Sequence, residues 1–462
     1  MFTNRFLLGI ITNTKATGEK MVTDLTKGNP DKTLWKFTLP MIISVMFQQL
    51  YSTVDSIVAG QFAGVNALAA VGASYPITML FIAVANGSNI GCSVVISQLF
   101  GGKRITHMKT AVNTSIISSL ILSLILTAVG LSSSKVLLKA MGTPDNIMAD
   151  SVTYLNIYAA GMAFLFIYNI STAVFTALGD SKTPLYFLIF SSLTNIALDL
   201  IFAGPMKMGV AGVAWATFIA QGVSGILAFI ALLKKIRNIE SEKPKFFSGR
   251  MLLRITKVAV PSILQQSFVS VGNVFIQGLI NSFGAAVVAG FAAAMKLNTF
   301  TITTLVTLSN GISSYTAQNI GAHNTERVKK GFGSGLKIAL LVAIPFFIAF
   351  FIFPKYMMMI FVTHNNTDVI TAGVQFLKIV SPFYFLATVK IIVDGILRGS
   401  GAMLSFMVST FTDLILRVIF AFILTPHIGQ LGIWWSWPIG WIVASLASLA
   451  LYLSGVWKKA KV

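Results

Sequence analysis

The stretch LTNIALDLIF at residues 193–202 recurs as FTDLILRVIF at residues 411–420, a shift of 218 positions. Shifts of 218 to 221 positions also align identical residues elsewhere: Pro40 with Pro261, Gly60 with Gly278, and Gln98 with Gln318. An internal repeat of this length is typical of a transporter built from two copies of one structural unit. The repeat therefore predicts two similar lobes.

The composition indicates that both lobes lie in a membrane. Of the 462 residues, 55% are hydrophobic and 10% are charged, and the mean hydropathy is +0.81. Successive apolar runs of about 20 residues match the length of helix that spans a bilayer. We expect an all-α membrane protein with twelve transmembrane helices, at residues 34–59, 68–100, 109–132, 149–177, 184–204, 210–233, 253–283, 289–320, 332–354, 368–398, 404–425 and 430–456.

Each repeat would hold six of these helices. Because six is even, both lobes begin on the same side, and the pseudo-two-fold axis runs along the membrane normal. The predicted parts are a cytoplasmic N-terminal segment, an N-lobe, a linker, a C-lobe and a tail, at residues 1–33, 34–233, 234–252, 253–457 and 458–462. Residues 1–20 look unrelated to the first helix and its lead-in, so we expect Met21 to be the natural start. A cavity between the lobes would open to each side in turn.

The net charge of +20 has a one-sided distribution. If the N-terminus is cytoplasmic, about 26 Lys and Arg residues fall in cytoplasmic segments, whereas the external loops hold Lys135, Lys139, Lys207 and Lys355. This positive-inside asymmetry predicts a multi-pass protein of the plasma membrane with both termini in the cytoplasm. The basic excess then faces anionic lipid, which argues against nucleic acid as a partner.

Two carboxylates, Asp55 and Asp199, are the clearly intramembrane charges of the first repeat, and such residues usually line a cavity or an ion path. Tyr51 lies four residues before Asp55, and Asn195 lies four before Asp199, so each pair shares a helix face. Thr217 falls at a similar depth. These oxygen and amide groups suit Na⁺ or a proton better than a transition metal. The alternative is two isolated Asp residues bonded to backbone or water.

The second repeat carries charges spaced four apart on two helices: Lys390, Asp394 and Arg398, then Asp413 and Arg417. This spacing predicts ion pairs within each helix that brace the lobe. Alternatively, Asp394 or Asp413 is a proton or substrate site that its basic neighbour switches. Lys296 is placed to pair with either acid.

Six runs, taken in order, resemble the multidrug and toxic compound extrusion (MATE) transporters: QQLYSTVDSIVAGQFAG (48–64), ALGDSKTP (177–184), TNIALDLIF (194–202), GVAGVAWAT (209–217), GISSYTAQNIGA (311–322) and LRGSGA (397–402). The resemblance covers nearly the whole chain from about residue 21. It implies a V-shaped, two-lobed fold and export of amphipathic, often cationic compounds against inward Na⁺ or H⁺. It also implies a cation site at Asp55, Asn195, Asp199 and Thr217, with Tyr51 as a neighbour.

One departure from the family concerns the C-lobe. Some relatives carry a Glu on helix 7 and an Asp on helix 10, and these positions fall near Val269 and Ala387 in this sequence. Neither residue is acidic, which puts cation coupling in the C-lobe in doubt.

We therefore expect a secondary active exporter that works by rocker-switch antiport, with H⁺ or Na⁺ as the coupling ion and no cofactor. It would be a monomer, would not be an enzyme, and would bind Na⁺, if at all, at Asp55, Asn195 and Asp199. One alternative is a lipid-linked oligosaccharide flippase, which needs a basic cavity and is kept open by Lys390, Arg398 and Arg417. A membrane sensor or scaffold is the other.

Overall fold

The computed structural model describes residues 23–58, 65–362 and 366–459. Met21 and Gly60 lie outside these ranges, and so do the side chains of residues 52–66 and 68, including that of Asp55. Throughout the described ranges the regular elements are helices, which confirms the all-α prediction. Ten of them are long and apolar enough to cross a membrane, and a bent pair forms an eleventh span. The first predicted helix corresponds to α3 (Pro30–Val58), which is not among these eleven spans.

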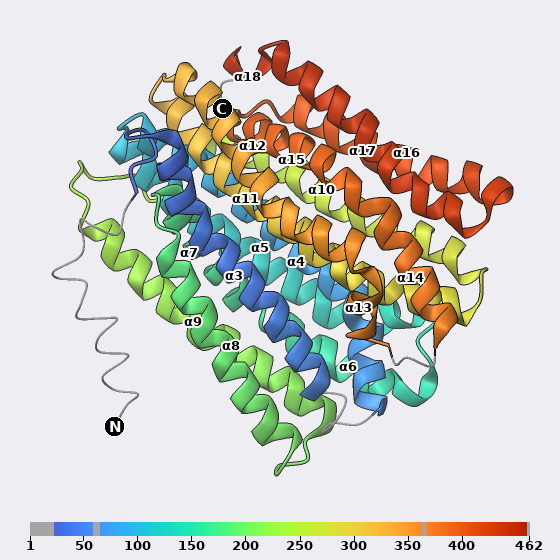
Figure 1. Ribbon diagram of the computed structural model, residues 1–462. Coiled ribbons are helices and arrows are strands. Elements are labelled where there is room, and N and C mark those ends of the chain that lie inside the picture. The colour runs from blue at the N-terminus through green and yellow to red at the C-terminus, as the bar shows by residue number, and fades with distance from the viewer. Residues whose placement is uncertain (1–22, 59–64, 363–365, 460–462) are drawn as a thin grey trace.

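The helices fall into two groups that lie side by side (Figure 1). The N-lobe consists of α3 (Pro30–Val58), α4 (Val65–Gly101), α5 (Ile105–Ala140), α6 (Asp145–Ala160), α7 (Met162–Ala177), α8 (Lys182–Ala203) and α9 (Gly209–Arg237). The C-lobe consists of α10 (Gly249–Asn281), α11 (Ala285–Gly321), α12 (Thr325–Phe347), the π-helix η2 (Ile348–Ile352), α13 (Pro354–Met359), α14 (Thr367–Val380), the 3₁₀ turn η3 (Ser381–Phe383), α15 (Tyr384–Ser400), α16 (Met403–Ile428), α17 (Gln430–Leu453) and α18 (Val456–Lys459).

Two of the predicted helices are broken. The expected helix at 149–177 bends by 45° between α6 and α7, at Gly161. The expected helix at 368–398 is interrupted by η3, which contains Pro382. Glycine weakens a helix through its conformational freedom, and proline removes a backbone donor. The two breaks are 221 positions apart, so they occupy equivalent places in the repeat.

The lobes meet through equivalent close approaches. α4 packs on α10, and α11 packs on α3. A Cβ atom on Gly91 would lie 2.6 Å from the Cβ of Ala259, so only glycine lets α4 approach α10 this closely. Where α11 packs against α3, a Cβ atom on Gly311 would likewise lie 2.5 Å from Cγ2 of Thr38. Since Gly311 and Ala259 follow Gly91 and Thr38 by 220 and 221 positions, the interface repeats the pseudo-two-fold symmetry.

Gln98 and Gln318 join the lobes near one end of this interface, and we call the pair the amide latch. Gln98 Nε2 donates to the carbonyl oxygen of Gly399 over 3.0 Å. Gln318 Nε2 donates to that of Ala177 over 2.7 Å. The last carbonyls of a helix have no partner within the helix. Each glutamine therefore satisfies the end of a helix in the opposite lobe.

Residues 23–29 cross the same end, and we call them the N-terminal strap. Thr23 N donates to Gly179 O of the N-lobe over 3.1 Å. Arg327 of the C-lobe donates through Nε to Leu25 O over 3.1 Å and through Nη1 to Gly28 O over 2.6 Å. The strap and the amide latch together close the interface at the end predicted to be cytoplasmic.

Candidate cation site and interlobe cavity

Tyr51, Asn195 and Asp199 form a hydrogen-bonded chain between α3 and α8, which pack together. The Tyr51 hydroxyl donates to Asn195 Oδ1, and Asn195 Nδ2 donates to Asp199 Oδ2 over 3.0 Å. Asn195 and Asp199 are each only 1% exposed. The four-residue spacing on α8 brings the amide and the carboxylate together, as the sequence predicted.

The other two predicted members are placed less fully. Asp55 follows Tyr51 by one turn of α3, and its side chain lies outside the described residues. Thr217 is half-buried on α9, which packs against α8. Within the described ranges Thr217 makes no hydrogen bond, so the structure brings Tyr51, Asn195 and Asp199 together without joining Thr217 to them.

The chemistry of this group suits a hard monovalent cation or a proton. A phenol, an amide and a carboxylate offer oxygen ligands, and oxygen is the preferred ligand of hard cations. Because a carboxylate in the apolar part of a membrane is costly to keep charged, Asp199 gains most from a bound cation or proton.

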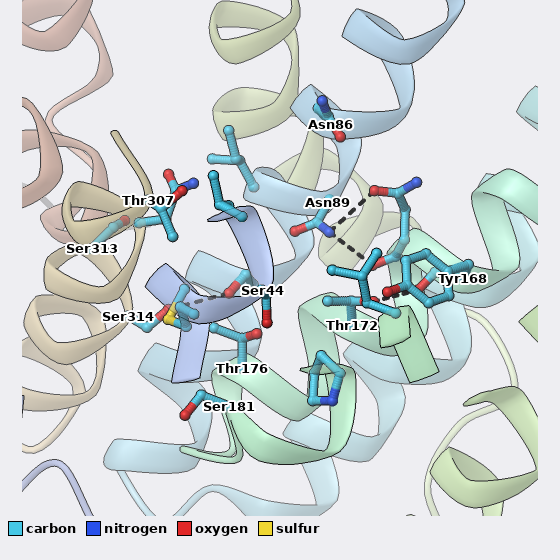
Figure 2. A pocket seen from close by; sticks show the side chains of 18 of the residues that line it. Ser44, Asn86, Asn89, Tyr168, Thr172, Thr176, Ser181, Thr307, Ser313 and Ser314 are labelled. Carbon is cyan, nitrogen blue, oxygen red and sulfur yellow. Dashed lines mark hydrogen bonds between the residues drawn. The ribbon is translucent and has the colours of Figure 1, made fainter. Parts of the chain in front are cut away.

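A cavity of about 270 Å³ lies between the lobes. It is lined by residues of α3, α4, α7, α8, α11 and α15. Amide side chains are prominent in its lining: Gln48, Asn86, Asn89, Asn169 and Asn310. Asn89 Nδ2 donates to Asn169 O over 2.9 Å, and hydroxyl groups such as those of Thr172 and Thr176 lie nearby (Figure 2). Among the lining residues that the structure describes, Arg398 alone is charged.

The cavity and the candidate cation site share two helices. On α3, the lining residue Gln48 precedes Tyr51 by three positions. On α8, the lining residue Leu188 precedes Asn195 by seven positions, which is roughly 10 Å along a helix. A movement of α3 against α8 would therefore change both the interlobe cavity and the candidate cation site.

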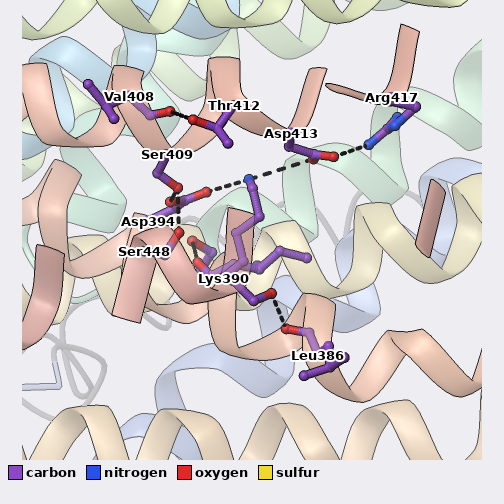
Figure 3. A network of polar contacts seen from close by, with 12 residues as sticks. Leu386, Lys390, Asp394, Val408, Ser409, Thr412, Asp413, Arg417 and Ser448 are labelled. Carbon is purple, nitrogen blue, oxygen red and sulfur yellow. Dashed lines mark hydrogen bonds and ion pairs between the residues drawn. The ribbon is translucent and has the colours of Figure 1, made fainter. Parts of the chain in front are cut away.

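The charged residues of the C-lobe form a buried cluster, which we call the ion-pair quartet (Figure 3): Lys390, Asp394, Asp413 and Arg417. Lys390 Nζ lies 2.7 Å from Asp394 Oδ2 and 3.9 Å from Asp413 Oδ2. Arg417 Nη2 lies 2.9 Å from Asp413 Oδ1, and its guanidinium lies 4.0 Å from the ring centroid of Trp437. The predicted pairs within α15 and within α16 are present, and Lys390 also links the two helices.

Two basic residues do not join the quartet. Arg398, the third member of the predicted series on α15, donates from Nη2 to Asn310 Oδ1 over 2.7 Å. Lys296 is not within ion-pair distance of Asp394 or Asp413 in the described structure, contrary to expectation. Its ammonium lies 5.8 Å from the ring centroid of Phe361 instead. The spacing along one helix predicted neighbours within that helix, but it could not predict contacts between helices.

The sequence reasoning missed the amide lining and the place of Arg398. Asn and Gln residues inside apolar helices were the available signal, because a buried amide needs partners or a polar cavity. Nothing in the spacing of Lys390, Asp394 and Arg398 indicated that the Arg398 side chain faces a cavity.

The chain has clear relatives among known proteins. The MatE family model matches residues 40–201 and 261–423, once in each lobe. The matches begin at Pro40 and Pro261, the prolines that the repeat aligns. A probable multidrug resistance protein of Bacillus subtilis, YpnP, is 29% identical over 95% of this chain and 98% of its own length. A probable multidrug resistance protein of Thermotoga maritima, NorM, is 25% identical over 93% of this chain and 94% of its own length.

A solved structure agrees in fold. A MOP superfamily transporter from Pyrococcus furiosus superposes with a TM-score of 0.89 at 24% identity, over 95% of this chain and 99% of that one. The paired family matches, the two-lobed all-α architecture and the multidrug resistance relatives agree with one another. The chain is a multi-pass membrane protein that belongs to the MatE family, the multidrug and toxic compound extrusion transporters.

Proposed function

We propose that this chain is a secondary active exporter of amphipathic small molecules, driven by Na⁺ or H⁺ moving inward. The coupling ion binds Asp55, Asn195 and Asp199, with Tyr51 and Thr217 completing the site. The observation that carries the proposal is the pair of hydrogen bonds that link Tyr51 to Asn195 and Asn195 to Asp199. These hydrogen bonds join α3 and α8, two of the six helices that line the interlobe cavity.

Coupling follows from competition for Asp199. A cation or proton that binds this carboxylate competes with Asn195 Nδ2, and a change at Asn195 alters its bond with Tyr51 on α3. α3 contains Pro40, a residue at which helices bend, and the cavity residues Met41 and Ser44 come directly after it. The ion thus acts by favouring one arrangement of α3 over another, which is the differential affinity that any coupling requires.

The cavity limits the choice of cargo. At about 270 Å³ it suits a small molecule, because ligand pockets usually begin near that size. A flippase for a pyrophosphate-linked glycan would need several cations in the cavity. Lys390 and Arg417 are held in the ion-pair quartet and are not lining residues, so the exporter is favoured. The described lining holds no carboxylate, so we do not extend the proposal to cationic cargo.

The proposal also includes topology and assembly. Both termini face the cytoplasm of a cell bounded by the plasma membrane, which follows from the positive-inside asymmetry. One chain supplies both lobes and both walls of the cavity, so a monomer suffices.

Everted membrane vesicles test the proposal. Na⁺ and H⁺ gradients are imposed separately, and accumulation of the fluorescent amphipathic dye tetramethylrhodamine is measured for wild type and Asp55→Asn. One gradient should drive accumulation in wild type, and Asp55→Asn should abolish that response. Asp150→Asn, an exposed change on α6, is the matched control and should behave as wild type. Full gradient-driven transport by Asp55→Asn would refute the mechanism.

A further inference from the structure

Among the described charges around the quartet, Arg398 is the base without an ion-pair contact. The quartet contains two acids and two bases, and its ion pairs join each base to an acid. Asp394 is the acid one turn before Arg398 on α15. Its two oxygens already bind Lys390 and Ser409. Asp394 attracts Arg398 only through space, and with Arg398 the cluster holds three bases and two acids, so one positive charge is in excess.

The side chain of Arg398 is held in place at the wall of the cavity. It is only 5% exposed and is nevertheless a lining residue. Nη2 donates to Asn310 Oδ1, and the guanidinium lies 5.6 Å from the ring centroid of Phe406. Its Nε has no hydrogen-bond partner among the described residues. A guanidinium has five N–H donors, so most of its capacity is unused.

A buried cation without a carboxylate is costly unless something else compensates it. The lining residues around Arg398 are neutral amides, hydroxyls and apolar side chains. A ligand that brings a negative charge to Arg398 would remove this cost. Carboxylate and phosphate groups match the planar fork of a guanidinium, with two parallel hydrogen bonds.

We propose that Arg398 is the anion subsite of the interlobe cavity, and that it binds the carboxylate or phosphate group of an amphipathic cargo. This inference rests on the proposed export function and specifies the cargo of the same cavity. Asn310 is part of the subsite, because its contact with Arg398 through Oδ1 leaves its Nδ2 donor for the ligand.

The rest of the cavity suits the remainder of such a molecule. The apolar lining residues come from the N-lobe helices: Met41, Val45, Ile90, Val94, Pro184 and Leu188. α7 adds Tyr168, Thr172 and Thr176, spaced four apart, to the lining. The expected cargo is therefore a largely apolar molecule that carries one anionic group and, on one side, polar atoms that can hydrogen-bond to the hydroxyl groups of α7.

A pair of dyes that differ at one group provides the test. Tetramethylrhodamine carries a free carboxylate, and its methyl ester lacks that charge. Binding of each dye to the purified full-length protein in detergent is followed by fluorescence anisotropy. The proteins are wild type, Arg398→Gln, Arg398→Lys and the control Lys355→Gln, which removes an exposed positive charge that is not part of the cavity lining.

Wild type should bind the free acid about tenfold to a hundredfold more tightly than the ester, as expected for a charge-assisted hydrogen-bonded pair. Arg398→Gln should lose this preference and retain ester binding, which also shows that it is folded. Arg398→Lys should keep part of the preference, and Lys355→Gln all of it. A wild type without preference, or an Arg398→Gln protein that retains it, would overturn the inference.

The same readout separates this inference from the proposed function. Dye binding requires no ion gradient, so loss of gradient-driven transport in vesicles would refute the exporter and leave the anion subsite standing. Conversely, gradient-driven transport of the ester with no acid preference in binding would refute the subsite and leave the exporter standing.

Discussion

α7 of the N-lobe and α15 of the C-lobe are equivalent helices that present different chemistry. Each is followed by a left-handed glycine, Gly179 with φ +80° and Gly401 with φ +90°. The residues three, seven and eleven positions before these glycines correspond: Thr176, Thr172 and Tyr168 on α7, and Arg398, Asp394 and Lys390 on α15. The same backbone positions carry hydroxyl groups in one lobe and charges in the other.

The comparison shows how a duplicated fold divides two tasks. The N-lobe keeps its α7 row neutral and places a buried carboxylate on α8, at Asp199. The position equivalent to Asp199 in the 218-residue shift is Arg417, which is paired with Asp413. The C-lobe thus uses its charges to hold α15, α16 and α17 together, and it leaves one base at the cavity.

The largest effect should come from breaking the quartet. Asp413→Asn removes one acid and leaves Arg417 and Lys390 sharing a single carboxylate. Loss of one partner from a buried ion pair costs about 3 to 5 kcal/mol of stability. The melting temperature in detergent should fall clearly for Asp413→Asn and hardly at all for Asp199→Asn, because Asn still accepts a hydrogen bond from Asn195. Equal melting temperatures for the two variants would contradict the conclusion that the buried charges stabilise the C-lobe more than the N-lobe.

Transport should show the opposite pattern. Asp199→Asn should lower gradient-driven export by about 100-fold, because coupling free energies between linked sites reach that size. Counterflow, the exchange of cargo without an ion gradient, should persist. Reconstituted proteoliposomes measure both, with Asp150→Asn as the control. Undiminished gradient-driven export would show that the coupling ion binds elsewhere.

The two halves of the amide latch should respond to a similar degree, although Gln318 Oε1 also accepts a hydrogen bond from Leu25 N of the strap over 3.3 Å. Gln98→Leu removes the amide donor to Gly399 O, and Gln318→Leu removes the closer of two donors to Ala177 O, whose other donor is Ser97 Oγ at 3.5 Å. Each loss should cost about 1 to 2 kcal/mol. Both variants should therefore populate a state opened at this end to a similar degree. Distances between spin labels at the ends of α4 and α11 would measure that opening. A strong effect of one glutamine alone would show that the lobes do not share the latch equally.

The smallest effect should come from Tyr51→Phe. This change removes the hydroxyl that donates to Asn195 and keeps the ring, so it should cost about 0.5 to 1 kcal/mol. The apparent affinity for the coupling ion should fall about two- to fivefold. The ion dependence of transport rate measures this shift, and Tyr168→Phe, on the hydroxyl row of α7, is the comparison. An unchanged affinity for the coupling ion would show that the Tyr51 hydroxyl does not contribute to the cation site.

The sequence predicted the fold well because hydrophobic run length and the repeat constrain it directly. It also predicted the Asn195–Asp199 and Lys390–Asp394 contacts, since residues four apart on one helix must be neighbours. It could not predict the Asn310–Arg398 contact or the Lys390–Asp413 link, because these depend on how helices rotate against each other. The breaks at Gly161 and Pro382 were also missed, because a bilayer-length apolar run looks the same whether or not it is straight.

The N-terminal strap has a consequence for the order of events during synthesis. Thr23 can reach Gly179 as soon as the N-lobe is in place, but Leu25 must wait for Arg327, 302 residues later in the chain. At ordinary elongation rates that delay is roughly 15 to 60 s. A chain stalled or truncated between the lobes therefore has a strap whose carbonyls lack their guanidinium. Docking of this segment marks a molecule whose synthesis has passed Arg327, on the third span of the C-lobe.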